Sequence, residues 1–327
     1  MVAIVFIALA AGCASALMFA SIISGVLTSL LLFYLAPLPL MVAAIGWGPL
    51  GASIGGIAAA CGLGATFGLS YGIAYAVTVA LPAWWLGHLV LLGRPVVPVG
   101  SPGSDVAATA PDLPDLEWYP VGRLLLWISG FAILTTFAAL LTLGTDAAAI
   151  TATLQRGLLR IIGPDGEAPS GEIEQWVDVL VAIAPAAASV VAMLTLTLNL
   201  WLAAKITATS GRLQRPWPDM KTAALPPITL VVLCVAIAFC FGGGLIAVLA
   251  EIATSALMMA YALTGFAVLH TLTLTLRSRT FWLGSTYALV VVFGWPVLAM
   301  AMLGLADAMF GFRQRYLRQQ PPPLPAP

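Results

Sequence analysis

The first 93 residues contain no Asp, Glu, Lys or Arg, and Arg94 is the first formal charge. Charged residues make up about a quarter of an ordinary globular chain, because surface that faces water needs polar cover. A segment of this length without charge therefore lies in lipid, or against other helices that lie in lipid. It restricts the fold more than any other feature of the sequence.

The rest of the composition agrees with this. The 327 residues are 61% hydrophobic and only 8% charged. A spanning helix needs about 20 apolar residues, so the apolar runs allow eight or nine passes. We expect an all-α polytopic transmembrane helix bundle. The net charge is +0, and so the basic footprint of a nucleic-acid-binding protein is missing.

Gly, Ser and Pro divide the charge-free block, residues 1–93, into four predicted spans. Breaks are expected at Ser21 to Gly25, at Pro37 and Pro39, and at the glycines Gly62, Gly64 and Gly68. The spans are about 2–20, 22–36, 40–61 and 66–92. The second is short for a crossing, which is typical of discontinuous helices at transporter binding sites, although a tilted and kinked helix explains it equally.

Glycines recur at four-residue spacing in this block, at Gly51 and Gly55 and again at Gly64, Gly68 and Gly72. The spacing predicts one small-residue helix face, which lets backbones approach closely. Packing inside the bundle and a homodimer contact both remain open.

Residues 94–120 are rich in Pro, Gly, Ser and Asp and predict a flexible polar loop. A transmembrane bundle, 121–310, follows. Within it, 146–162 predicts an amphipathic helix capped by Thr145 or Asp146. Its apolar face suits a helix in the membrane interface, or one docked on the bundle.

Further spans are expected at about 121–144, 176–204, 225–241 and 245–273, with a loop at 205–223. Lys and Arg in that loop, at Arg277 and Arg279, and in the basic then Pro-rich tail 311–327 all favour the cytoplasmic side. The run 281–309 either crosses once, folds back at Gly294-Trp295-Pro296, or lies in the membrane plane.

Ionisable groups inside apolar spans are costly, so each is a candidate for function. Glu251 lies in LIAVLAEIATSALMMA, where it could bind a cation, carry a proton or pair with Lys205. A water-facing carboxylate near the interface is the alternative. Trp84, Trp85 and His88 either line a ligand pocket or anchor a helix end at the headgroups.

Asn199, one turn after Thr195, is the remaining substrate-binding candidate, with hydrogen bonding between helices as its alternative role. No G-x-S-x-G, H-E-x-x-H, P-loop or Rossmann pattern occurs, and the four cysteines form no C-x-x-C pair. We therefore predict no enzyme, no cofactor and no metal site. Any ATP-driven work would need a separate subunit.

Four segments together resemble the YybS-like family of bacterial polytopic membrane proteins. They are Ala36-Pro37-Leu38-Pro39 with Gly46, Leu81 to Gly87, Thr264-Gly265, and Gly304 to Asp307 leading to Phe312-Arg313. The family is distantly similar to the substrate-binding components of energy-coupling-factor transporters. The resemblance implies the bacterial inner (cytoplasmic) membrane, small-molecule uptake, and ATPase and coupling subunits as partners.

The sequence thus predicts an integral membrane protein that binds and translocates a small molecule with a separate energising partner. The alternative is an accessory or assembly subunit of a larger membrane complex, without transport activity. The lipid bilayer is a partner in both cases.

Replacing Glu251 by Gln is expected to weaken ligand retention or uptake, because the carboxylate is the predicted polar contact. Folding should be unaffected. Uptake by cells expressing the Glu251→Gln variant checks this, and unchanged uptake would remove Glu251 from the mechanism.

Overall fold

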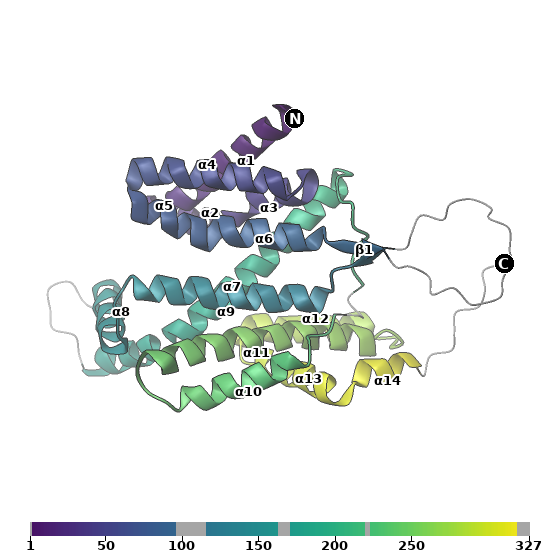
Figure 1. Cartoon of the computed structure of the whole chain (residues 1–327). Coiled ribbons are helices and arrows are strands. Elements are labelled where there is room, and N and C mark those ends of the chain that lie inside the picture. Colours follow the sequence, from purple (N-terminus) through teal and green to yellow (C-terminus); the bar gives the residue numbers. More distant parts are fainter. Residues whose placement is uncertain (1, 96–115, 163–170, 220–222, 319–327) are drawn as a thin grey trace. The chain divides into compact units, whose positions relative to one another are not determined.

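The computed structural model describes residues 2–95, 116–162, 171–219 and 223–318. The chain forms two compact units, one of Met1–Pro120 with Asn199–Trp217, and one of Val121–Leu198 with Pro218–Pro327. Helices make up nearly all of the described residues (Figure 1). The predicted all-α polytopic bundle is confirmed.

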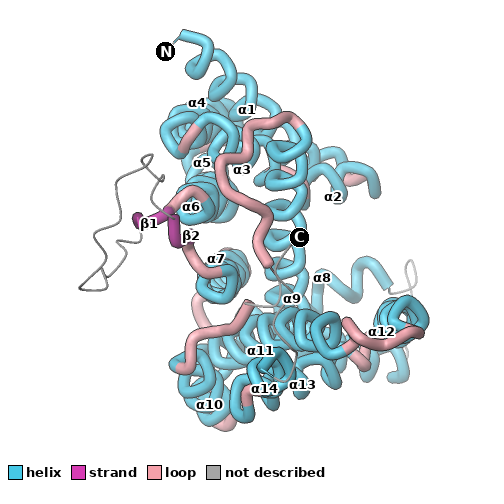
Figure 2. Tube along the Cα trace, turned by 90° about the vertical axis from the view of Figure 1, so that its right-hand side faces the viewer, coloured by secondary structure: helices cyan, strands magenta, loops and turns pink. Residues whose placement is uncertain are grey.

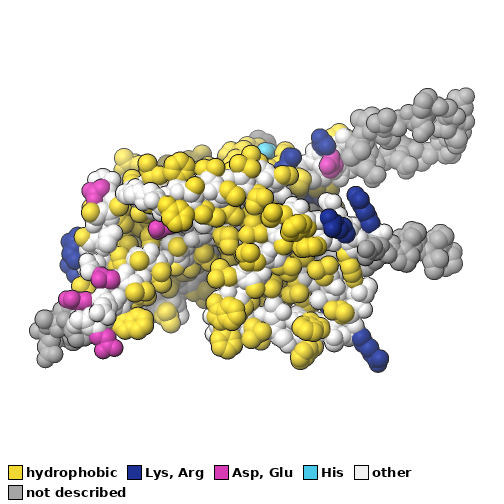
Figure 3. Space-filling model, turned by 90° about the horizontal axis from the view of Figure 1, so that it is seen from below, with side chains coloured by type: hydrophobic (Ala, Val, Ile, Leu, Met, Phe, Trp, Pro, Cys, Tyr) yellow, Lys and Arg dark blue, Asp and Glu magenta, His cyan; other side chains and the backbone are white. Residues whose placement is uncertain are grey.

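Seven helical segments among the described residues are long and apolar enough to cross a membrane, or eight if one bent pair counts as a span. The helices of 13 and 15 residues, Ile228–Cys240 and Arg279–Phe293, are apolar but shorter. Hydrophobic side chains cover most of the face seen in Figure 3, and charged side chains gather toward its margins. That distribution fits a surface covered by lipid tails.

The first unit contains the four predicted N-terminal passes. Its elements are α1 (Val2–Ala20), the 3₁₀ turn η1 (Ser21–Ser24), α2 (Leu27–Tyr34), α3 (Pro37–Trp47), α4 (Pro49–Phe67), α5 (Leu69–Tyr75), the π-helical η2 (Ala76–Ala80), α6 (Leu81–Val90), β1 (Gly93–Pro95), β2 (Leu116–Trp118) and the end of α9 (Gly171–Thr209).

Glycines with positive φ mark the breaks between these passes. Gly25 (φ 67°), Gly48 (φ 94°) and Gly68 (φ 101°) each adopt a conformation that L side chains rarely take. The predicted interruption at Pro37 is confirmed, because α2 ends at Tyr34 and Pro37 occupies the first turn of α3, where its missing N–H costs nothing. The predicted end of the second pass at residue 36 was wrong, because α2 and α3 together form one segment long enough to cross a membrane. The second span therefore continues to Trp47 and turns at Gly48.

The predicted glycine face at residues 64–72 was also wrong. Gly68 ends α4 and turns the chain into α5, so Gly64 and Gly72 lie on different helices. A Cβ on Gly72 would lie 2.9 Å from Gly64 Cα. The glycines allow these two helices to touch across a turn.

A reciprocal glycine contact joins α1 to α4. A Cβ on Gly12 would overlap the carbonyl oxygen of Gly55, and one on Gly55 would overlap the carbonyl oxygen of Ala8. The two backbones therefore meet with no side chain between them. Gly55 therefore packs against another helix of the same unit, which is the first of the two predicted alternatives, packing inside the bundle.

The second unit contains its own glycine crossing. Its elements are α7 (Val121–Leu141), α8 (Ala147–Ile162), the first part of α9, α10 (Ile228–Cys240), α11 (Gly244–Leu272), α12 (Arg279–Phe293), α13 (Val297–Phe310) and α14 (Phe312–Arg318). A Cβ on Gly265 of α11 would overlap the Met300 carbonyl oxygen, and one on Gly304 of α13 would overlap that of Tyr261.

Helix α8 begins as predicted, with Asp146 Oδ1 accepting from the Ala149 N–H at 2.8 Å. Ile150 is buried in a cluster with Leu140 and Ile252. Ile161, near the other end of α8, is 81% exposed. The first half of this helix is thus docked on the bundle, while its end leaves apolar surface uncovered.

The last apolar run folds back, which was one of three alternatives. Gly294 (φ 70°) separates α12 from α13. The Thr275 and Tyr316 hydroxyls lie 2.7 Å apart, so the segment before α12 meets α14, which follows α13. The basic residues at both ends of this run therefore lie at the same end of the helix pair. This agrees with the rule that places both groups on the cytoplasmic side.

Two ends of the predicted polar loop, 94–120, form an antiparallel ribbon that the sequence did not suggest (magenta in Figure 2). Arg94 pairs with Glu117, and their charged atoms lie 2.6 Å apart. Residues 96–115 between the strands, the predicted helix stop at 163–166 and the Pro-rich tail at 321–327 lie outside the described residues.

Gly55→Ala should destabilise the protein by about 1–3 kcal/mol, because overpacking forces the backbones of α1 and α4 apart. Gly62→Ala in the same helix is the control, since nothing lies within 4 Å of its Cβ position. Thermal unfolding in detergent measures both. Equal behaviour of the two variants would show that close backbone contact at Gly55 is not needed.

Candidate functional site

Three of the predicted site residues form an aromatic cluster on α6. The Trp84 and His88 rings stack with centroids 6.4 Å apart, and the Trp85 ring lies 6.1 Å from His88 and 5.6 Å from Trp84. All three side chains are partly exposed. Their spacing of three and four residues on one helix produces the cluster.

Asn199 is fully buried on α9, and its side-chain amide donates to the Tyr34 carbonyl oxygen at 2.8 Å. That bond ties α9 to the end of α2, which is the predicted alternative of hydrogen bonding between helices. Glu251 lies on α11 in the second unit, partly buried, beside the fully buried Ile252. The predicted residues are thus divided between the two units.

The second unit also buries a complete ion pair. Arg313 Nε donates to Asp307 Oδ2 at 2.7 Å, its backbone N–H donates to Oδ1 at 2.8 Å, and its Nη1 donates to the Ala223 carbonyl oxygen at 2.8 Å. The two side chains are only 6% and 7% exposed. Asp307 thus pairs with Arg313, six residues later, and also caps the first turn of α14.

This ion pair is structural rather than reactive. Gly311 (φ 65°) ends α13 in a left-handed turn that directs Arg313 back to Asp307. The guanidinium also donates to the carbonyl oxygen of Ala223, so it links the segment before α10 to the end of α13. Because both Asp307 carboxylate oxygens and the Arg313 Nε and Nη1 are hydrogen-bonded and the two side chains are buried, we interpret the pair as part of the packing of this unit.

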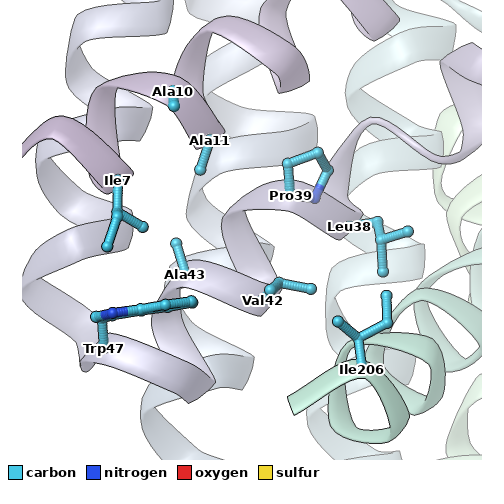
Figure 4. Close-up of a pocket in the computed structure, with 9 residues that line it drawn as sticks. All are labelled: Ile7, Ala10, Ala11, Leu38, Pro39, Val42, Ala43, Trp47 and Ile206. Atoms are coloured by element: carbon cyan, nitrogen blue, oxygen red, sulfur yellow. The ribbon is translucent and has the colours of Figure 1, made fainter. Parts of the chain in front are cut away.

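A groove in the first unit is a candidate binding site (Figure 4). Its volume is about 400 Å³, within the usual range for small-molecule sites. Hydrophobic side chains from α1, α3 and the end of α9 line it: Ile7, Ala10, Ala11, Leu38, Pro39, Val42, Ala43, Trp47 and Ile206.

Small residues explain why a groove forms here. Ala10, Ala11 and Ala43 leave space between α1 and α3 that larger side chains would fill. A buried hydrogen-bond chain fixes the two walls, because the Tyr75 hydroxyl donates to Ser15 Oγ at 2.7 Å and Ser15 donates to the Ala36 carbonyl oxygen at 2.7 Å. Ser15 is on α1 and Ala36 directly precedes α3.

Cations lie at one end of the groove. The Arg212 guanidinium carbon is 5.1 Å from the ring centroid of Trp47, a groove residue, and Lys205 Nζ is 4.3 Å from that of Trp217. Both distances are within the range of cation–π attraction. Lys205 was predicted to lie in a loop, which was wrong, because α9 continues to Thr209.

None of the nine lining side chains is ionisable, so the groove can hold an apolar group but offers no acid, base or nucleophile. No cluster of three or more His, Cys, Asp or Glu side chains suited to a metal ion occurs in the described residues. Sequence reasoning missed this site, because its lining has no pattern beyond apolar residues on separate helices.

Comparison with known proteins gives no match to a family model, a curated protein or a solved structure. The site must therefore be interpreted from its own geometry.

Arg313→Met should cost about 3–5 kcal/mol of stability, because it leaves the Asp307 carboxylate buried without its counter-charge. The control is Arg94→Met, which breaks an ion pair whose side chains are 79% and 52% exposed. Exposed pairs contribute only about 0–1 kcal/mol. Chemical denaturation of the two variants in detergent tests this, and a loss as small for Arg313→Met as for Arg94→Met would contradict it.

Proposed function

We propose that this multi-pass membrane protein binds a small hydrophobic or amphipathic molecule in the groove between α1, α3 and α9. The observation that supports it most is the hydrophobic lining, which comes from three helices and leaves most lining residues partly exposed. A ligand with an apolar part gains free energy there by leaving water, at about 25 cal/mol per Å² of apolar surface buried.

Capture and translocation of that molecule would need energy from a separate subunit. The sequence contains no nucleotide-binding loop. The resemblance to the YybS-like family and, distantly, to the substrate-binding components of energy-coupling-factor transporters favours such a partner. It also favours the bacterial inner membrane as the location. We retain Glu251, Trp84, Trp85, His88 and Asn199 as secondary candidates for substrate binding.

Ala10→Trp tests the proposal, because Ala10 is an exposed residue of α1 that lines the groove, so the larger side chain fills the groove without entering the core. Leu9→Trp is the control: Leu9 is 43% exposed on the same helix but is not a lining residue. Both proteins are purified in mild detergent, and retained small molecules are identified by native mass spectrometry.

We expect the wild type and Leu9→Trp to retain the same molecule in equal amounts. The amount retained by Ala10→Trp should be at least tenfold lower. Equal retention by all three proteins would contradict binding in this groove.

An accessory or assembly subunit is the second candidate, favoured by α12. No residue of that helix is buried in the chain, and Val291, Val292 and Phe293 are 60–83% exposed at its end. Lipid or a partner protein could cover it. A pull-down of the tagged chain from its native membrane in mild detergent separates the functions: an ATPase pair with a coupling subunit supports transport, and stoichiometric components of another complex support assembly.

A further inference from the structure

The basic end of the first unit is built by the way in which α9 stops. Gly211 (φ 68°) follows the helix, its N–H donates to the Ala208 carbonyl oxygen, and the Arg212 N–H donates to the Thr207 carbonyl oxygen at 2.8 Å. This is the hydrogen-bond pattern of a Schellman motif. The turn reverses the chain and brings the Arg212 side chain over Trp47.

Trp47 thereby connects two different environments. One part of its side chain lines the apolar groove, and the ring carries the Arg212 guanidinium 5.1 Å from its centroid. Ile206, another lining residue, directly follows Lys205 in α9. Arg212 therefore lies at the part of the lining formed by Trp47, and Lys205 lies on the helix that supplies Ile206 (Figure 4).

Cations predominate in the chain segment that follows Lys205, in which Asp219 is the first acidic residue. The segment from Lys205 to Trp217 contains three cations, Lys205, Arg212 and Arg215, and no Asp or Glu. Arg215 is partly buried, and this desolvation lowers the pKa of its guanidinium from the ordinary value. A nearby anion would stabilise its charged form. Among the described residues, Lys205 and Arg212 have their charged ends over aromatic rings rather than in a salt bridge.

We infer that the groove is a site for an anionic phospholipid, with one acyl chain along Ala10, Ala43 and Ile206 and the phosphate at Arg212 and Lys205. This rests on the proposed function, because it names the class of amphipathic molecule that the groove binds. Guanidinium donors suit phosphate oxygens, and basic pockets between transmembrane helices are suited to anionic headgroups. A tryptophan at the boundary suits the level at which tail and headgroup join.

The test uses the full chain purified in a neutral detergent and titrated separately with phosphatidylglycerol and phosphatidylcholine that carry identical acyl chains. Native mass spectrometry counts the bound lipid. Four proteins are compared: the wild type, Lys205→Gln with Arg212→Gln, the charge-preserving Arg212→Lys, and the groove-filling Ala10→Trp. Thermal unfolding confirms that each variant is folded.

We expect the wild type to prefer phosphatidylglycerol, and the double variant to lose about fivefold of its affinity for that lipid per cation removed. Arg212→Lys should keep most of the preference, and the double variant should bind phosphatidylcholine as the wild type does. Ala10→Trp should lose both lipids.

Other results separate the two proposals. Equal binding of both lipids by the wild type, abolished by Ala10→Trp, would overturn the anionic preference and leave the groove as an apolar site. If neither lipid binds in the groove but another molecule is retained there, the lipid inference alone is overturned. If neither lipid binds and no other molecule is retained, the proposed function is overturned as well. Equal competition by glycerol phosphate, which has no acyl chain, would assign the cations to free phosphate and overturn the lipid site.

Discussion

Direct contact between helix backbones at glycine is the interaction on which both units depend. Lipid gives helices no hydrophobic reason to associate, because tails are as apolar as leucine, so close packing must supply the attraction. Gly12 meets Gly55 in the first unit, and Gly265 meets Gly304 in the second. At each crossing a single added methyl group would overlap a carbonyl oxygen of the facing helix.

The crossing of α1 on α4 also determines what the neighbouring helices can do. With α1 held by its glycine, the alanines at its positions 10 and 11 face α3 across a gap rather than a packed interface. The hydrogen-bond chain through Ser15 keeps that gap from closing or widening. The groove is therefore a consequence of two rigid contacts on either side of small residues, and the end of α9 supplies its basic rim.

The sequence revealed the class of fold because charge cannot be placed in lipid at low cost. The 93 charge-free residues indicated the membrane-spanning block. The cap of α8 at Asp146 and the pair of Asp307 with Arg313 are local contacts, which join residues close together in the sequence. Span ends were harder to place, because the turn before Pro37 lies inside one span, whereas the span itself ends at Gly48, which Pro49 follows.

The candidate site could not be predicted, for a physical reason. Its walls come from residues 7–11, 38–47 and 206, and only the tertiary fold brings them together. Ionisable residues such as Glu251 could be identified as candidates, because the free-energy cost of a charge inside an apolar span can be inferred from the sequence. Alanines on two separate helices carry no such signal, and the approach of Arg212 to Trp47 depends on the turn at Gly211.

The most direct test of the account is to photo-crosslink phosphatidylglycerol carrying a diazirine in its acyl chain to the purified protein and to map the modified residues. We predict that modification concentrates on the residues that line the groove: Ile7, Ala10, Ala11, Leu38, Pro39, Val42, Ala43, Trp47 and Ile206. Modification spread evenly over lipid-exposed helices such as α12, without enrichment at the groove, would contradict it.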